Sequence, residues 1–119
     1  ISSPLENYPL LLMYVYDYPV EGVITQDPSP THQAYDFSCI PGDPVRAVHA
    51  GAGTFYWSHK MGWVFVLKYE DRETSYSHLG EVGPQTYYLQ GDVIGLCGDT
   101  GEWSSGPHVH FESNKPYRF

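Results

Sequence analysis

The stretch WVFVLKYE, residues 63–70, decides the fold class of this chain. β-Branched and aromatic residues dominate it, which is typical of a strand. The charged turn EDRE (70–73) leads into a second strand-like run, ETSYSHL (73–79), so the two runs are predicted to form a hairpin. No stretch of twelve residues keeps the 3.6-residue period of a helix. We therefore predict a mostly antiparallel all-β protein, a sandwich or open barrel with little or no helix.

Further runs with the composition of strands lie on both sides of this hairpin, separated by segments rich in Gly and Pro. They are MYVYDY (13–18), AYDFSCI (34–40), DVIGLC (92–97) and HVHFES (108–113). The run VRAVHAGAGTFYW (45–57) is predicted to form a bent strand pair, with turns before it at 27–31 and 41–44. Residues 1–12 are expected to form an irregular arm. With 119 residues, the chain is long enough for a single domain, residues 1–119, around one core.

Composition and charge argue against several classes of partner. The chain has 6 basic and 14 acidic residues, a formal net charge of −8, and its basic residues are scattered. Nucleic-acid binding is excluded on this ground, because phosphate contacts need concentrated positive charge. The longest apolar run near the start, LLLMYV (10–15), is too short for membrane insertion. Cys39 and Cys97 could form one disulfide or remain two buried thiols, and their spacing alone does not decide between these.

The run HVHFES places two of the six histidines one residue apart. Side chains alternate along a strand, so His108, His110 and Glu112 share one face while Val109 and Phe111 point into the core. Neighbours on one face are ~7 Å apart, close enough for one histidine to hold a metal ion while the other reaches a water. The alternative is a pair of solvated strand histidines.

Two other segments supply candidate polar residues. His32 and Asp36 are four residues apart, ~13 Å along an ideal strand and too far for one metal ion, but the prolines before His32 allow a curled entry. Imidazole and carboxylate together are a normal zinc ligand set. His78 ends the run SYSH; taken alone, a strand-end histidine is more often structural or exposed than catalytic.

Six motifs in order resemble those of the lysostaphin-type (LytM-like) zinc metallopeptidases, which cut peptide bonds in bacterial peptidoglycan. They are PVEGVIT, HQAYDF, GDPVRA, YSHL, GDVIGLCGDTG and GPHVHFE, spread over residues 19–112. The resemblance implies the all-β fold of that family, the duplicated hybrid motif type. It implies one Zn²⁺ per chain, held by His32, Asp36 and His110, with His78 and His108 as catalytic residues beside the water.

The chemistry of these residues is consistent with that assignment. Three protein ligands leave the fourth zinc position open, as in catalytic sites. The chain has no HExxH motif, so a histidine must act as the base, and its ordinary pKa of ~6.5 suits this role. We assign His108 as the base and His78 to the oxyanion or the leaving amine, although the two roles could be exchanged. Glu112 either orients His110 by a hydrogen bond or is an exposed strand residue.

The chain departs from the family pattern near the first ligand and in one loop. Where the family has a tyrosine before the first ligand, this chain has Val23. Tyr16, Tyr18 and Tyr35 are the candidates to replace it. The loop TGEWSSGPH is one residue longer than usual, apparently by Trp103, which we expect to shape a substrate subsite. His49 and His59 match no motif; His49 is expected to be structural and His59 solvated.

The predicted function is a zinc endopeptidase that hydrolyses peptidoglycan cross-links or cross-bridges, outside the cytoplasm: secreted, periplasmic or virion-associated. The alternatives are a non-enzymatic binding or regulatory module and a structural domain of a virion or secretion machine. The ligand set favours the enzyme, because all three ligands and both further histidines are present. The acidic charge predicts weak capture by anionic wall polymers. Targeting would then depend on an upstream domain, a partner or a larger assembly such as a phage particle.

Overall fold

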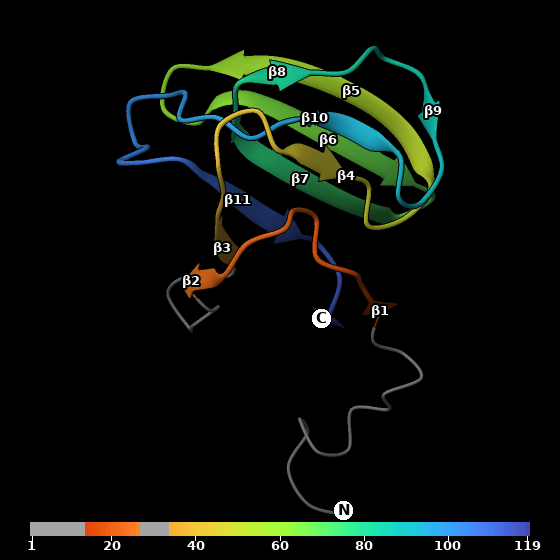
Figure 1. The fold of residues 1–119 in the computed structure, drawn as a ribbon. Helices are drawn as coiled ribbons and strands as arrows, with labels where there is room; N and C mark the ends of the chain where they lie inside the picture. Colours follow the sequence, from red (N-terminus) through yellow and green to blue (C-terminus); the bar gives the residue numbers. More distant parts are fainter. Residues whose placement is uncertain (1–13, 27–33) are drawn as a thin grey trace, which may run out of the picture.

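A computed structural model describes residues 14–26 and 34–119 of the chain (Figure 1). In these two ranges every regular element is a strand, which confirms the all-β prediction. The strands are β1 (Tyr14–Val15), β2 (Ile24–Gln26), β3 (Ala34–Ser38), β4 (Pro44–Arg46), β5 (Gly51–Ser58), β6 (Gly62–Tyr69), β7 (Arg72–Leu79), β8 (Glu81–Val82), β9 (Tyr87–Tyr88), β10 (Val93–Leu96), β11 (His108–Ser113) and β12 (Tyr117–Arg118). The predicted arm and the turn at 27–31 lie outside the described residues.

A seven-stranded antiparallel sheet forms the larger layer, in the order β2-β3-β11-β7-β6-β5-β9. The predicted hairpin is its centre: β6 pairs with β7 around the turn at Glu70 and Asp71. A second hairpin joins β5 to β6 with Trp57 opposite Trp63. Three of its six strand pairs, β2–β3, β5–β6 and β6–β7, join strands that are consecutive in sequence, and the other three join strands far apart in the chain. Strand β11, for example, comes late in the sequence and lies between β3 and β7.

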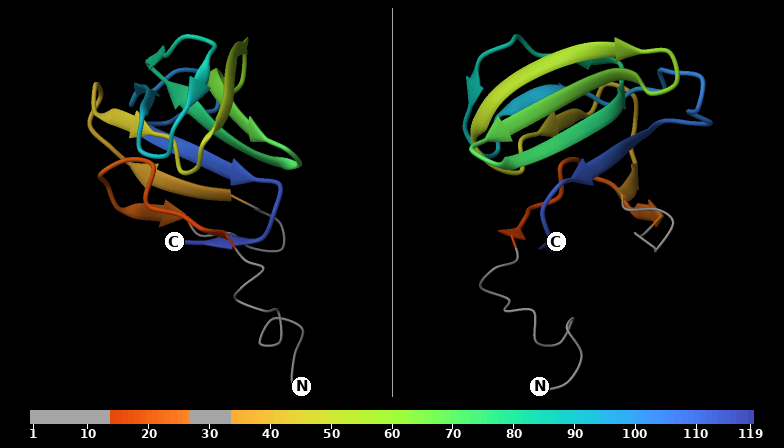
Figure 2. Two further views of the ribbon diagram at one scale, coloured as in Figure 1. Left: turned by 90° about the vertical axis from the view of Figure 1, so that its right-hand side faces the viewer. Right: turned by 180° about the vertical axis from the view of Figure 1, so that it is seen from behind.

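A smaller antiparallel sheet, β4-β10-β8, lies against the curved β5–β6–β7 part of the large sheet (Figures 1 and 2). Fully buried side chains from both layers meet between them, among them Val45 and Ile94 from the small sheet and Phe65 and Leu67 from the large one. At ~25 cal/mol per Å² of apolar surface removed from water, this contact is the main stabilising term of the fold. The layered, open arrangement agrees with the predicted fold class.

Two local predictions differ from the structure. The run 45–57 does not form a strand pair, because β4 pairs with β10 in the small sheet while β5 belongs to the large one. Gly53 in β5 faces the rings of Phe65 and Tyr88, and a Cβ there would lie 2.3 Å from the nearest ring atom, so its glycine serves packing rather than a bend. In residues 14–18, the described part of MYVYDY, only β1 is a strand, and it pairs in parallel with β12 beside the C-terminus (Figure 2).

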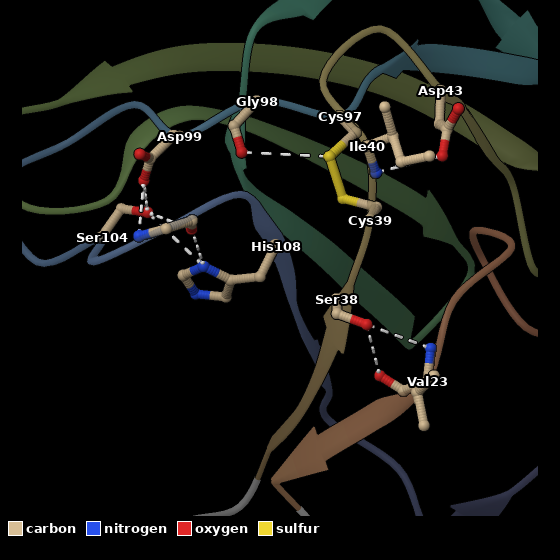
Figure 3. Close-up of a disulfide and its surroundings, with 11 residues drawn as sticks. Val23, Ser38, Cys39, Ile40, Asp43, Cys97, Gly98, Asp99, Ser104 and His108 are labelled. Atoms are coloured by element: carbon tan, nitrogen blue, oxygen red, sulfur yellow. Dashed lines mark hydrogen bonds between the residues drawn. A yellow bond between two sulfur atoms is a disulfide. The ribbon is translucent and has the colours of Figure 1, made fainter.

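Cys39 and Cys97 form a disulfide, which resolves the alternative left open by their spacing (Figure 3). Their Cα atoms are 6.3 Å apart. Cys39 follows β3 in the large sheet and Cys97 follows β10 in the small one, so the bridge ties the two sheets together. It closes a loop between residues 58 apart in the sequence. The chain-entropy model assigns about 4 kcal/mol to a loop of that length.

The bridge predicts a measurable loss of stability when it is removed. Replacing both cysteines, Cys39→Ser with Cys97→Ser, should lower the free energy of unfolding by about 2–4 kcal/mol, because the unfolded chain regains its freedom. Urea unfolding of the variant beside the wild type measures this. Thiol titration of the unfolded, unreduced wild type should find no free thiol. Two titratable thiols per chain would contradict the bridge.

His49, which matches no family motif, is buried under the large sheet with 3 % of its surface exposed, in the predicted structural role. Its neighbours form an unbroken chain of hydrogen bonds. The Val48 amide donates to the Tyr76 hydroxyl (3.1 Å), Tyr76 and Thr74 bond at 3.1 Å, and Thr74 bonds His49 Nε2 (2.8 Å). His49 Nδ1 donates to the Ala50 carbonyl (2.6 Å). Each group is satisfied when His49 is neutral with its proton on Nδ1.

This network predicts a pH-dependent contribution to stability. Burial, with a further contribution from the Arg72 charge, lowers the pKa of His49 in the folded protein. The unfolded chain therefore binds a proton more readily, and stability present above pH ~6.5 is lost as the pH falls through the folded pKa. Below pH ~6.5 the free energy of unfolding should fall more steeply for the wild type than for His49→Gln. The exposed-histidine variant His59→Gln is the control and should keep the wild-type slope; equal slopes for wild type and His49→Gln would contradict the assignment.

Candidate active site

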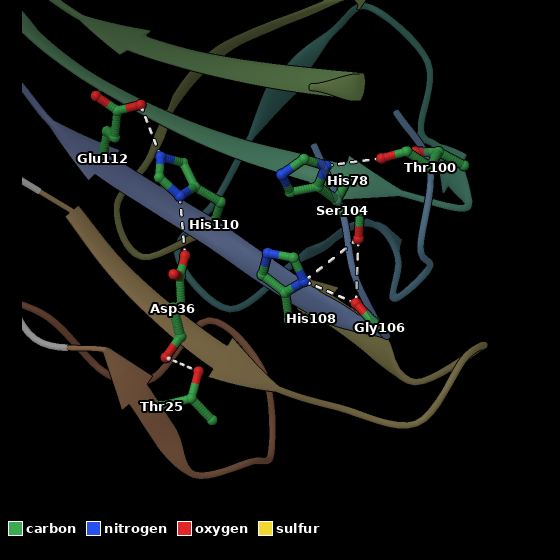
Figure 4. A network of polar contacts seen from close by, with 9 residues as sticks. All are labelled: Thr25, Asp36, His78, Thr100, Ser104, Gly106, His108, His110 and Glu112. Carbon is green, nitrogen blue, oxygen red and sulfur yellow. Dashed lines mark hydrogen bonds and ion pairs between the residues drawn. The ribbon is translucent and has the colours of Figure 1, made fainter. Parts of the chain in front are cut away.

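The centre of the site is a pair of residues on neighbouring strands, Asp36 in β3 and His110 in β11 (Figure 4). The β3–β11 register places them directly opposite each other, so their side chains share one face of the sheet. His110 Nδ1 lies 2.8 Å from Asp36 Oδ1, and His110 Nε2 lies 3.0 Å from Glu112 Oε2. Of the two alternatives for Glu112, a hydrogen bond to His110 or an exposed strand residue without that contact, the structure has the hydrogen bond. Only 15 % of each of the Asp36 and His110 side chains is exposed.

The alternation predicted for HVHFES is present. Val109 and Phe111 have no exposed surface and belong to the core. His108, His110 and Glu112 are intermediate or exposed and lie on the other face. The two buried side chains thus hold the polar ones on the outside of the sheet.

His78 reaches this face through an irregularity in β7. Between the pairs Trp63–Leu79 and Phe65–Tyr76, the single residue Val64 faces two residues of β7, Ser77 and His78, which is a β-bulge. His78 has a φ of 64°, in the left-handed region that non-glycine residues rarely adopt. A bulge changes the direction of a side chain. The His78 ring, which an unbroken strand would direct away from the site face, thereby lies 6.2 Å from the His110 ring.

Thr100 holds the end of β7 and the His78 ring together. Its carbonyl accepts from His78 Nδ1 at 2.7 Å, its hydroxyl donates to the Leu79 carbonyl at 2.6 Å, and the Trp63 amide donates to that hydroxyl at 3.1 Å. Gly62 is required for this close contact, because a Cβ at that position would lie 2.2 Å from the Thr100 hydroxyl. With Nδ1 donating to Thr100, neutral His78 carries its lone pair on Nε2.

His108 is arranged in the same way. Its ring centre lies 4.7 Å from that of His78, and its Nδ1 donates to the Gly106 carbonyl at 2.8 Å. Both rings are therefore held at Nδ1 by a backbone carbonyl, and both present their other nitrogen toward the side of β11 where His110 lies (Figure 4). Two imidazoles with unprotonated Nε2 atoms on one face are suited to accept and pass on protons.

The surroundings shift the pKa values of two site histidines in opposite directions. Burial lowers the pKa of His78, and positive charge on His108 or His110 lowers it further, while the Thr100 hydrogen bond opposes this. Burial also lowers the pKa of His110, but the hydrogen bonds and charges of Asp36 and Glu112 outweigh it and raise the pKa to about 9. In the absence of metal, His110 thus holds a proton between two carboxylates. A cation is favoured at this position.

The residues of the site fit a zinc ion as far as they are described. A carboxylate oxygen and an imidazole nitrogen face each other across 2.8 Å, and tetrahedral zinc would separate such ligands by about 3.3 Å. A small opening of the pair therefore admits the metal. Among residues 14–26 and 34–119, no three His, Cys, Asp or Glu side chains form a metal-binding group. The predicted third ligand, His32, lies outside the described residues, so its role stays a prediction.

An open hollow of about 240 Å³ adjoins the site. Asp36 and His108 line one side of it, and Thr25, Ser38 and Ser105 supply hydroxyl groups. The predicted subsite residue Trp103 is 63 % exposed and packs under Lys60, whose Nζ is 4.6 Å from the ring centre. It is not among the residues that line this hollow, so its role in substrate binding remains a prediction.

The three tyrosines proposed for the oxyanion lie elsewhere. Tyr16, Tyr18 and Tyr35 each pack against the ring of Phe119, with ring centres 6.4, 5.5 and 4.8 Å away. Tyr35 alternates with Asp36 along β3 and so belongs to the opposite face of the sheet. The structure therefore assigns none of them to the side of the histidines.

Sequence reasoning passed over three polar residues that support the histidines: Asp99, Thr100 and Ser104. Their contacts are made across the loop between β10 and β11, and Thr100 and Ser104 each contact a site histidine. Asp99 and Thr100 lie in the quoted motif GDVIGLCGDTG, so the motif marked their position. Their function depends on contacts with residues 22 positions back and 5 positions ahead, which no spacing rule predicts.

Comparison with known proteins agrees with this geometry. The model of peptidase family M23 matches residues 30–118, and the chain therefore belongs to that family. The predicted resemblance to lysostaphin-type peptidases is confirmed. No protein with a curated description matches the chain.

Several solved structures are similar. A Pseudomonas aeruginosa protein described as a peptidase of family M23 has 25 % identity and a TM-score of 0.75, covering 89 % of this chain and 48 % of its own. A zinc-containing peptidase from Vibrio cholerae has 26 % identity and a TM-score of 0.72, covering 82 % and 36 %. The antimicrobial peptidase lysostaphin from Staphylococcus simulans has 30 % identity and a TM-score of 0.66, covering 92 % and 45 %. The chain spans less than half the length of each.

The bulge at His78 predicts that the left-handed backbone of this residue is strained. A left-handed φ lowers the stability of the folded protein by about 1 kcal/mol at a non-glycine residue, and glycine avoids this cost because it has no Cβ. His78→Gly should therefore be about 1 kcal/mol more stable to urea than His78→Ala, while both lose the imidazole. If His78→Ala proves equally or more stable, the left-handed conformation is not a source of strain.

Proposed function

We propose that this chain is a zinc-dependent endopeptidase that hydrolyses peptide bonds in bacterial peptidoglycan, in cross-links or cross-bridges. One observation carries the proposal: Asp36, His110, His78 and His108, drawn from three neighbouring strands, converge on one face of the sheet. Membership of peptidase family M23 supports the peptidase activity. The zinc-containing relative from Vibrio cholerae supports the choice of metal.

In the proposed site His32, Asp36 and His110 hold one zinc ion per chain. When bound, zinc acts as a Lewis acid that makes water acidic and polarises the substrate carbonyl. Glu112 keeps the His110 ring in the orientation in which Nδ1 faces Asp36. The contacts of His110 with Glu112 and with Asp36 thus support an orientation of both proposed ligands that is present without the metal.

The two remaining histidines handle protons. His108, with Nδ1 held by Gly106, accepts a proton from the attacking water at Nε2. His78, with Nδ1 held by Thr100, contacts the substrate oxyanion or the leaving amine through Nε2 when that nitrogen carries a proton. The ring centres are 4.7 Å apart, which supports action of both rings on one scissile bond.

The surface and the disulfide support the proposed substrate and compartment. The hollow beside Asp36 and His108 is open and lined by hydroxyls, so it suits an extended peptide backbone that needs hydrogen-bond partners. The Cys39–Cys97 disulfide fits an oxidising compartment, which supports a location outside the cytoplasm. Within the described residues, no helix has the length and apolarity to cross a bilayer. With a net charge of −8, targeting to an anionic wall would come from a partner, a further domain or a larger assembly.

The proposal predicts that the two histidines of HVH differ in kind when each is replaced by alanine. His110→Ala removes a ligand and should lose both zinc and activity, with lower heat stability in the presence of zinc. His108→Ala should keep its zinc and its fold and lose ~10²–10⁴-fold in rate, because only proton transfer is lost. Elemental analysis of each purified variant, beside digestion of defined muropeptides, measures both effects.

The same experiment tests the alternatives. His59→Ala, an exposed histidine outside the site, is the control and should resemble the wild type. If zinc-loaded wild type leaves a glycine bridge and a D-amino-acid stem peptide both intact, the chain is a binding or structural module. If no zinc binds after reconstitution, the enzyme assignment is wrong. If His108→Ala loses its zinc and His110→Ala keeps it, the ligand is His108 and the base is His110.

A further inference from the structure

The loop between β10 and β11 folds back on itself around one carboxylate, that of Asp99 (Figure 3). Its Oδ1 accepts a short hydrogen bond from the Ser104 hydroxyl and another from the Gly106 amide at 3.0 Å. Ser104 Oγ in turn lies 3.4 Å from Nδ1 of His108, and the Gly106 carbonyl lies 2.8 Å from the same nitrogen. Asp99 itself is exposed and does not contact a site histidine directly. Its hydrogen bonds reach His108 through Ser104 and Gly106.

Counting protons shows what this arrangement decides. A serine hydroxyl has one proton, and within reach of Ser104 Oγ lie three acceptors: Asp99 Oδ1, the Gly106 carbonyl and, in one tautomer, His108 Nδ1. The Gly106 carbonyl can only accept, so it favours the His108 tautomer with its proton on Nδ1. A Ser104 proton directed at Nδ1 would favour the other tautomer. That tautomer carries its proton on Nε2 and cannot act as a base there.

We propose that Asp99 is a positioning residue that fixes the tautomer of His108 by engaging the only hydroxyl proton of Ser104. The inference rests on the proposed role of His108 as the base. With its proton directed to Asp99, Ser104 presents only lone pairs toward His108. Both neighbours of His108 Nδ1 are then acceptors, and Nε2 is left unprotonated toward the site.

The charge and backbone of the loop support this direction of the Ser104 proton. Hydrogen bonds from Ser104 and from the Gly106 amide lower the pKa of Asp99, so it is an ionised acceptor. A charge-assisted bond is stronger than one to a neutral carbonyl. Gly106 has a φ of 138°, which only glycine adopts readily. In this conformation its amide donates to Asp99, and its carbonyl faces His108 (Figure 4).

Removing the carboxylate should therefore release the Ser104 proton rather than merely loosen the loop. In Asp99→Ala the hydroxyl is free to donate to His108 Nδ1, and the Nε2–H tautomer gains population. In the double variant Asp99→Ala with Ser104→Ala, the competing donor is gone and only the Gly106 carbonyl remains. The double variant should then return to the wild-type tautomer, although it lacks more hydrogen bonds than the single one.

The test uses the full, zinc-loaded chain with ¹⁵N-labelled histidine, in which NMR of the ring nitrogens reports the tautomer of each imidazole. His108 should carry its proton on Nδ1 in the wild type, in Ser104→Ala and in the double variant, and shift toward Nε2–H in Asp99→Ala alone. His78, held by Thr100, is the internal control and should not change. Asp99→Asn, whose Oδ1 can accept the same two bonds, should keep the wild-type signature. This measurement needs no substrate, so its outcome is separate from whether the chain cleaves peptidoglycan.

Kinetics on a muropeptide that the wild type cleaves provide the second readout. Asp99→Ala should lower kcat by about tenfold with little change in KM and in zinc content, and the double variant should recover to near the rate of Ser104→Ala. A purely structural role of Asp99 predicts the opposite order, with the double variant no better than the single one. The proposal would be overturned by that order of rates. It would also be overturned if the His108 tautomer is unchanged in Asp99→Ala or if Asp99→Asn loses the wild-type tautomer. Absence of cleavage by the wild type would count against the proposed function only.

Discussion

Burial of Val109 and Phe111 is the constraint on which the site depends. Both side chains are fully buried, and burial of each stabilises the fold by roughly 1.5–3 kcal/mol. They alternate along β11 with His108, His110 and Glu112. A slip of one residue in the register of β11 would expose both apolar side chains and bury the polar ones. The same register sets His110 opposite Asp36 on one side and opposite Ser77 on the other. The hydrophobic core therefore determines which nitrogen and oxygen atoms meet on the outer face.

Around this centre, backbone carbonyls orient the imidazoles. Thr100 holds His78 and Gly106 holds His108, each through Nδ1, and both carbonyls belong to the loop between β10 and β11. That loop begins directly after Cys97, whose disulfide partner Cys39 follows the strand of Asp36. One covalent bridge thus connects the strand that supplies a predicted metal ligand to the loop that holds both histidines proposed to transfer protons. Carbonyl oxygens accept only, so they fix a tautomer where hydroxyls alone would not.

Prediction from the sequence succeeded where a residue's role follows from local alternation. The β6–β7 hairpin followed from strand-like composition and a charged turn, and the common face of the two histidines of HVHFES followed from alternation along the strand. It failed where a role depends on a departure from the pattern. The run 45–57 was expected to form a strand pair, but β4 belongs to the small sheet and β5 to the large one. The bulge that redirects His78 has no counterpart in the composition of ETSYSHL, because it arises from pairing with Val64 on another strand.

The sequence by itself determined the fold class, the family and the residue types of the site, because side-chain periodicity and motif order are written along the chain. It also supplied Asp36 and His110 as partners, through the family motifs that contain them. Only the tertiary structure decided that Cys39 and Cys97 are bridged, that Tyr16, Tyr18 and Tyr35 pack against Phe119, and that Asp99 and Ser104 are hydrogen-bonded beside His108. The physical reason is that hydrogen bonds and disulfides act over about 2–4 Å, and which distant residues come within that range is set by how the sheets pack.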